Sequence, residues 1–212
     1  ATVSAMVALP ALAMALTAPT SATVWRVGGA AQLVTYTTNL NAALDQVTIE
    51  LSRDGGATWE TLIASAVASG SHSITPSGPI TTAARVRVTR VNSAVVIATS
   101  SPANFVIAGP VTITAPLATS VWGASSTRSV TWTFVGGSAT SQFDVEYSDD
   151  NGATYTVLAT GVVATTATPG SWTGTMPSTA SAAARVRVSP TGNPALATVS
   201  AMVALPALAM AL

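Results

Sequence analysis

Residues 47–59, with the sequence VTIELSRDGGATW, join a strand pattern directly to a turn pattern. Val47, Ile49 and Leu51 alternate with polar residues, and this period of two predicts a half-buried β-strand. An aspartate and two glycines follow at positions 54–56, a combination typical of a hairpin turn. We therefore expect a fold that is built from short antiparallel strands.

The same pattern returns 96 residues later, at 143–155, with the sequence FDVEYSDDNGATY. At similar offsets TAP at 17–19 returns at 114–116, and ARVRV at 84–88 returns at 184–188. Turn residues separate short strand patterns throughout, and no long amphipathic helical pattern occurs. An internal repeat of this kind indicates homologous modules. We predict an all-β chain of two tandem immunoglobulin-like β-sandwich modules, 11–109 and 110–206, with about seven strands each.

Residues 1–16, ATVSAMVALPALAMAL, recur unchanged as residues 197–212. A secretory leader would carry a basic region and would not recur. A membrane helix needs about 20 apolar residues, whereas Thr2, Ser4 and Pro10 interrupt this shorter run. We interpret the segment as the seam of a 196-residue tandem repeat. Residues 1–10 would then be the last strand of a preceding repeat, and 207–212 the start of the next. A short subunit with the same strand at both ends is the alternative.

Apolar residues occupy both faces of the seam, unlike the alternating strands elsewhere. Such a strand should be covered on both faces, and left exposed it would be an edge that promotes association. We predict that residues 1–10 do not complete their own first module but project free or pack on another copy. Residues 197–206, in contrast, should pack within their own second module. The proposed assembly residues of the seam are Val3, Met6, Val7, Leu9, Val199, Met202, Val203 and Leu205.

The composition excludes several classes of function. Eight arginines balance eight acidic residues, and only 8% of residues are charged, against about 25% in an average protein. No basic surface is available for nucleic acid, and a net charge of zero favours self-association. The chain lacks cysteine, and His72 is its one histidine. We therefore expect no thiolate chemistry, multi-histidine metal site, cofactor or enzymatic activity.

Three groups of residues are candidate binding sites, and each also has a structural interpretation. His72 aligns with Trp172, which indicates a packing or surface position. Asp149, Asp150 and Asn151 lack the D-x-D-x-D-G spacing of a calcium loop and are interpreted as a turn. Tryptophans recur at module-equivalent positions, which favours core packing over a sugar-stacking platform. The five tryptophans are Trp25, Trp59, Trp122, Trp132 and Trp172.

The alternation also predicts a cross-strand ladder of charges. Glu50 should face Arg85 and Arg87 on a neighbouring strand. In the second module Asp144 and Glu146 should face Arg185 and Arg187. We interpret both sets as structural ion pairs rather than binding sites.

The hairpin sequence resembles the S-x-D-x-G-x-T-W Asp box of sialidase-like propellers, in which the box lies away from the active site. An aspartate accepts hydrogen bonds from the backbone N–H groups of the turn, glycine supplies positive φ, and the aromatic side chain covers the turn. The spacing of 96 residues does not fit propeller blades of about forty. The predicted turn residues are Ser52, Asp54, Gly56, Trp59, Ser148, Asp150, Gly152 and Tyr155.

Taken together, the TAP, hairpin and ARVRV segments resemble tandem bacterial immunoglobulin-like, fibronectin-type-III-like modules of secreted and cell-surface proteins; related modules occur in fungal cell-wall proteins. The resemblance implies an extracellular or cell-surface spacer or scaffold. The second module departs from it, because it ends in the seam rather than in a strand like 101–107.

We predict a structural repeat unit of an extracellular fibre, sheath or surface stalk that associates with copies of itself through apolar strands. Two alternatives are an adhesin spacer or weak carbohydrate-binding module, with glycans as ligands, and an accessory region of a secreted hydrolase. We expect no nucleic-acid partner and no membrane span in this segment.

Overall fold

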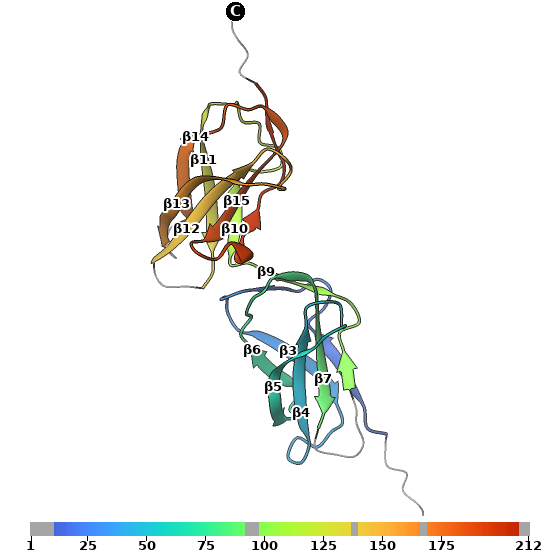
Figure 1. Ribbon diagram of the computed structural model, residues 1–212. Coiled ribbons are helices and arrows are strands. Elements are labelled where there is room, and N and C mark those ends of the chain that lie inside the picture. The colour runs from blue at the N-terminus through green and yellow to red at the C-terminus, as the bar shows by residue number, and fades with distance from the viewer. Residues whose placement is uncertain (1–10, 92–97, 137–139, 166–168, 208–212) are drawn as a thin grey trace, which may run out of the picture. The chain divides into compact units, whose positions relative to one another are not determined.

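The computed structural model of the chain describes residues 11–91, 98–136, 140–165 and 169–207 (Figure 1). The described elements are β-strands and one short 3₁₀ turn, Pro194–Leu196. Among the described residues, no helix is both long and apolar enough to span a membrane. The chain divides into two compact units: Ala1–Val24, Ala31–Ile74 and Thr81–Val106 form one, and Trp25–Ala30, Thr75–Ile80 and Ile107–Leu212 form the other. The predicted module bounds of 11–109 and 110–206 stay a prediction.

The first sandwich consists of β1 to β9, in two layers. One layer has the strand order β1-β3-β6, and the other has the order β2-β9-β7-β4-β5, with β8 also paired to β7. The strands are β1 (Met14–Ala18), β2 (Val24–Arg26), β3 (Gln32–Thr38), β4 (Gln46–Ser52), β5 (Glu60–Val67), β6 (Ser71–Ile74), β7 (Thr81–Arg90), β8 (Ala98–Ser100) and β9 (Phe105–Ala108).

The second sandwich, β10 to β17, repeats this order. One layer is β10-β11-β14, and the other is β13-β12-β15-β16, with β17 also paired to β15. This strand order confirms the predicted all-β fold of two tandem immunoglobulin-like sandwiches. The strands are β10 (Val111–Ala115), β11 (Thr127–Phe134), β12 (Thr140–Ser148), β13 (Thr156–Thr165), β14 (Gly170–Thr175), β15 (Ser181–Pro190), β16 (Thr198–Val199) and β17 (Val203–Leu205).

The alternating residues of the central strands fill the cores. On β4 the side chains of Val47, Ile49 and Leu51 are buried, and their counterparts on β12 are buried as well. Of the tryptophans, Trp25, Trp122 and Trp132 are buried, whereas the other two, Trp59 and Trp172, are half-buried. Core packing is therefore confirmed for the three buried rings, because a sugar-stacking platform requires an exposed ring face.

Trp132 is at the centre of the second core. Its ring meets Phe143 edge-on at a centroid distance of 5.6 Å. Gly170 is its cross-strand partner on β14, and a Cβ atom at that position would overlap the indole ring. The indole N–H is buried without a hydrogen-bond partner among the described residues. Glycine at 170 is thus required by the ring that lies against it.

Candidate assembly site

The seam strand β17 is built into the second sandwich between two partners. On one side it pairs with β15, where Val203 lies opposite Ala184 and Leu205 opposite Ser181. On the other side the backbone N–H of Trp122 donates to the carbonyl of Ala204 over 2.9 Å. Val203 and Leu205 are only 2% and 1% exposed and belong to the core cluster. The second core is therefore closed by seam residues.

The first sandwich fills the corresponding place with its own strand β9. This strand lies between β2 and β7, and Phe105 and Ile107 are buried there as Val203 and Leu205 are in the second sandwich. The seam residues Val3, Met6, Val7 and Leu9 lie outside the described residues, so the predicted behaviour of 1–10 stays a prediction.

A buried serine anchors the start of each last-strand segment, a feature that the sequence analysis missed. The Ser200 backbone N–H donates to the Val186 carbonyl, and the Val186 N–H donates to the Ser200 hydroxyl oxygen at 3.0 Å. Ser101 makes the same two bonds with Val86 in the first sandwich. The recurrence of a serine 99 residues apart is the signal that could have revealed this anchor.

The outer face of the seam differs from the expectation. Val199 is 41% exposed and Met202 is 50% exposed, so the prediction that both faces are covered is wrong within one copy. The reason is that β16 and β17 border only one core, and Val199 on β16 and Met202, between the two strands, point away from it. Two of the proposed assembly residues thus pack inward, and two are accessible to another molecule.

A shallow apolar hollow of about 440 Å³ adjoins β17. Its lining is Val121, Ala180, Ser181, Ala182, Ala204, Leu205 and Pro206. The lining has no charged side chain, and Val121 is well exposed. The hollow is thus an apolar surface next to the last strand of the second sandwich.

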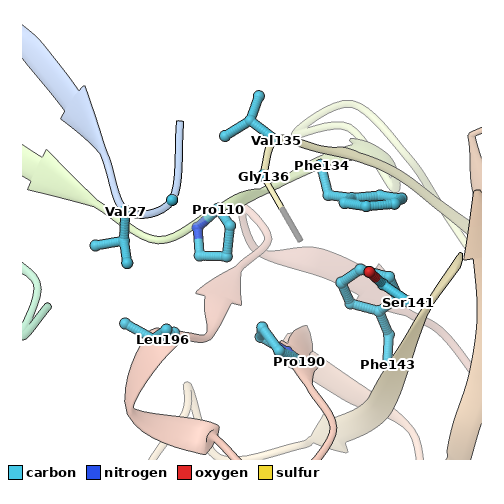
Figure 2. A pocket seen from close by; sticks show the side chains of 10 residues that line it. Val27, Pro110, Phe134, Val135, Gly136, Ser141, Phe143, Pro190 and Leu196 are labelled. Carbon is cyan, nitrogen blue, oxygen red and sulfur yellow. The ribbon is translucent and has the colours of Figure 1, made fainter. Parts of the chain in front are cut away.

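A second hollow, of about 180 Å³, lies within the second compact unit (Figure 2). Figure 2 shows side chains of Phe134, Phe143 and Pro190 around it, with the Ser141 hydroxyl among them. No titratable side chain lines this hollow. Its chemistry offers neither an acid nor a base, so we assign it no catalytic role.

The predicted hairpin network is present in both sandwiches. The Ser52 hydroxyl donates to Asp54 Oδ1 over 2.7 Å, and the Gly56 N–H donates to the Ser52 hydroxyl oxygen. The Thr58 N–H donates to Asp54 Oδ1 and the Thr58 hydroxyl to Oδ2, over 2.9 and 2.5 Å. Gly56 has φ +101°, the left-handed region that favours glycine.

The second hairpin repeats these bonds with Ser148, Asp150, Gly152 and Thr154. Every contact of both carboxylates named here stays within its own hairpin. The motif therefore shapes the turn and offers no free ligand oxygen pair for a substrate.

Acid is expected to destabilise the hairpins. Hydrogen bonds from the hydroxyl and then the N–H of the following threonine hold the pKa values of Asp54 and Asp150 well below that of an ordinary aspartate, which is about 3.9 in an unfolded chain. Because the folded pKa is depressed, this stability is complete above about pH 4 and is lost as pH falls through the folded pKa. Urea unfolding at a series of pH values should show it.

The matched variant for this measurement is Asp54→Asn with Asp150→Asn. It should be less stable at neutral pH and should lose less stability between pH 5 and pH 2 than the natural chain. Acid curves that run parallel for the two proteins would contradict the assignment.

The charge ladder forms in part. Glu50 binds Arg87 over 2.7 Å, and the guanidinium lies 4.3 Å from the ring centroid of Trp59. The second sandwich repeats this with Glu146, Arg187 and Tyr155, at 2.6 and 3.8 Å. Each pair thus joins two central strands and is covered by the hairpin aromatic.

The predicted contacts of Arg85, Arg185 and Asp144 in the ladder do not form, so this part of the prediction is wrong. Arg85 donates to Asn104 instead of Glu50, and Arg185 donates to Asn151. Asp144 accepts from the Gly161 N–H and the Thr191 hydroxyl. The pairing register explains this difference, because Glu50 lies directly opposite Arg87, whereas Arg85 lies opposite Ser52.

A double-mutant cycle on Glu146 and Arg187 is expected to give a coupling free energy of about 0.2–1 kcal/mol, the usual range for cross-strand pairs. Both side chains are mostly buried, so water screens the pair less than at an open surface. Urea unfolding of the two alanine variants and the double variant measures the coupling. A cycle on Arg185 and Glu146 is the control and should give none.

An ion pair that the sequence analysis missed links Asp45 with Arg90 over 2.5 Å. Hydrogen bonding to Arg90 lowers the pKa of Asp45. The two residues are 45 positions apart and have no counterparts at the repeat offset. No sequence signal marks the pair.

His72 is a packing residue. Its ring is stacked near Tyr36, with centroids 6.0 Å apart, and Nε2 lies 3.2 Å from the Tyr36 hydroxyl. His72 lies opposite Val34 as Trp172 lies opposite Val130, which agrees with the predicted alignment. Among the described residues, no three His, Asp or Glu side chains are grouped closely enough to hold a metal ion.

Comparison with solved structures found chains that align with most of this sequence at low identity. No protein-family model and no curated protein sequence matches the chain. Fibronectin(III)-like modules of Clostridium thermocellum CbhA align with 13% identity over 91% of this chain and 94% of theirs, with a TM-score of 0.32.

Red sea bream transglutaminase aligns with 10% identity over 91% of this chain and 31% of its own, with a TM-score of 0.43. The polymeric Ig receptor ectodomain of a teleost fish aligns with 6% identity over 92% of this chain and 100% of its own, with a TM-score of 0.35. On its own strand order, the chain is a pair of tandem immunoglobulin-like β-sandwiches.

Proposed function

We propose that the chain is a non-enzymatic structural repeat unit of an extracellular fibre, sheath or surface stalk. The observation that carries this proposal is the seam. A segment that occurs twice at a spacing of 196 residues supplies, at its second occurrence, the strand that closes the second core. One period therefore holds two complete sandwiches, and the same sixteen residues lead from one period into the next.

Strand β13 offers a route for lateral contact between copies. It is the outer strand of its sheet, and its ten residues include neither a charge nor a proline. Val157 and Val163 are 56% and 57% exposed. Soluble proteins usually protect an edge with charge, proline or a bulge. On β13, two register shifts in its pairing with β12 provide this kind of edge protection.

The corresponding edge of the first sandwich is better protected. Strand β5 begins with Glu60, which forms an ion pair with Arg53 over 2.8 Å. We therefore assign lateral association to β13 rather than to β5.

The proposal is tested by sedimentation velocity and electron microscopy of the purified chain. The natural chain should form arrays or filaments, and Val157→Lys with Val163→Lys should shift the material towards single copies. Leu44→Lys with Leu117→Lys adds the same charge at exposed loop positions and should leave assembly unchanged. A natural chain that stays a monodisperse monomer at high concentration would contradict the proposal.

The two alternative functions have less support. A glycan platform needs an exposed aromatic face, but the half-buried Trp59 ring is already covered by Arg87. A role as an accessory region of a hydrolase has no observation in its favour. Binding to a glycan array that is lost on Trp172→Ala would favour the adhesin alternative instead.

A further inference from the structure

We propose that the strand slot of the second sandwich accepts residues 1–10 of a second copy of this chain. The strand slot is the place between β15 and residues 121–124 that β17 fills. This proposal deepens the proposed function, on which it rests for its biological setting, by naming the partner segment and its binding site. It concerns head-to-tail joining, not lateral contact through β13.

The strand slot contacts types of side chain that residues 197–206 and residues 1–10 both contain. Leu205 and Val203 supply the buried contacts, and Ser200 supplies the anchor to Val186. The residues at the corresponding places in 1–10 are Leu9, Val7 and Ser4, because residues 1–16 and 197–212 are identical. A slot that binds one of the segments has the same chemical reason to bind the other.

The backbone bonds of the slot are also independent of which copy supplies the strand. The N–H groups of Trp122 and Ala124 donate to the carbonyls of Ala204 and Pro206 over 2.9 and 3.0 Å. The carbonyls of Ala8 and Pro10 are the equivalent acceptors in the other segment. Proline has no backbone N–H group, so the residue at the end of the strand leaves no donor without an acceptor.

The first sandwich does not compete for this segment. Its last-strand place is filled by β9, with Phe105 and Ile107 in the core. Val7 in the place of Phe105 would leave a void of several methylene groups, which a packed core does not tolerate. Residues 1–10 therefore match the second sandwich and not the first.

The donor copy can supply the segment without unfolding. Strand β1 begins at Met14, so four residues separate Leu9 from the first strand of the donor. Within the chain only two residues, Gly109 and Pro110, separate β9 from β10. A connection of four residues is therefore longer than one that already joins two folded sandwiches here.

The test empties the slot in the full chain. Val203→Asp with Leu205→Asp places two carboxylates where the core excludes water, so the local strand cannot stay. We expect this variant to form head-to-tail oligomers, with an average mass in sedimentation that rises several-fold with concentration and with the thermal transition of the second sandwich retained. All variants in this experiment also carry Val157→Lys and Val163→Lys. Lateral association through β13 then does not contribute to the measured mass, and the head-to-tail proposal is tested separately from it.

Adding Val7→Asp and Leu9→Asp to the slot variant should return it to a monomer and abolish the second transition, while the first transition stays as a folding control. Val7→Asp with Leu9→Asp alone should keep both transitions. The variant with aspartate at 7, 9, 203 and 205 should regain the second transition when a free peptide of residues 1–10 is added. The same peptide with Val7→Asp and Leu9→Asp should have no effect.

Three results would overturn the proposal. One is that the slot variant has the same average mass and the same loss of the second transition whether or not it also carries Val7→Asp and Leu9→Asp. Another is a peptide without effect. The third is a slot variant that keeps both transitions as a monomer at every concentration, because its slot would then be filled within one copy.

Discussion

Leu205→Ala is expected to lower the free energy of unfolding of the second sandwich by about 2–5 kcal/mol, the usual cost of removing a buried leucine side chain. Leu205 is almost fully buried and joins the core cluster with Trp122 and Ala184. The first sandwich should unfold as before, because its core is closed by β9. Urea unfolding followed by tryptophan fluorescence, with Trp122 and Trp132 reporting on the second sandwich, measures the loss.

Leu9→Ala is the matched control, because Leu9 has the same neighbours in sequence as Leu205. In a single copy at low concentration it should change neither transition, as the seam interpretation predicts. Leu205→Met keeps most of the volume and should cost less than about 1.5 kcal/mol. An equal cost for Leu9→Ala and Leu205→Ala would mean that residues 1–10 are part of a core in their own copy and would contradict the interpretation.

Trp132→Ala should be the most damaging single truncation, with a loss of about 3–5 kcal/mol in the second sandwich. The ring is fully buried and packs against Phe143. Trp132→Phe should cost much less, because it removes the buried N–H that has no partner. The half-buried Trp172 is the control, and Trp172→Ala should cost less than Trp132→Ala. Thermal unfolding monitored by circular dichroism ranks the four proteins.

Gly170→Ala tests the same contact from the opposite strand. The added methyl group would overlap the Trp132 ring, and overpacking of this kind costs about 1–3 kcal/mol. In the Trp132→Ala background the same substitution should be tolerated, because the ring is gone. A full penalty in both backgrounds would place the requirement for glycine in the backbone instead.

The period-two pattern was sufficient to predict the all-β fold and the inward positions of the central strands. The alternation of β4 places Val47 and Ile49 in the core without any knowledge of the partner strand. The hairpin bonds of Asp54 could also be predicted, because they are local and follow from the chemistry of the turn.

Contacts between strands were predicted less well, because they depend on register. The alternation places Arg85 and Arg87 on one face, but only the pairing decides that Glu50 lies opposite Arg87. The seam poses a related problem. Both of its faces are apolar, so the sequence did not show that Val203 would face the core while Met202 stayed exposed.

The placement of the arginines has a consequence for proteolysis. The chain has no lysine, and seven of its eight arginines lie in paired strands, where Arg87 and Arg187 are also held by glutamates and aromatic rings. A trypsin-like protease cleaves extended segments that can leave their sheet, so digestion should follow the small fraction of unfolded sandwiches. The seam contains no basic residue, so such an enzyme has no cleavage site within residues 1–16 or 197–212.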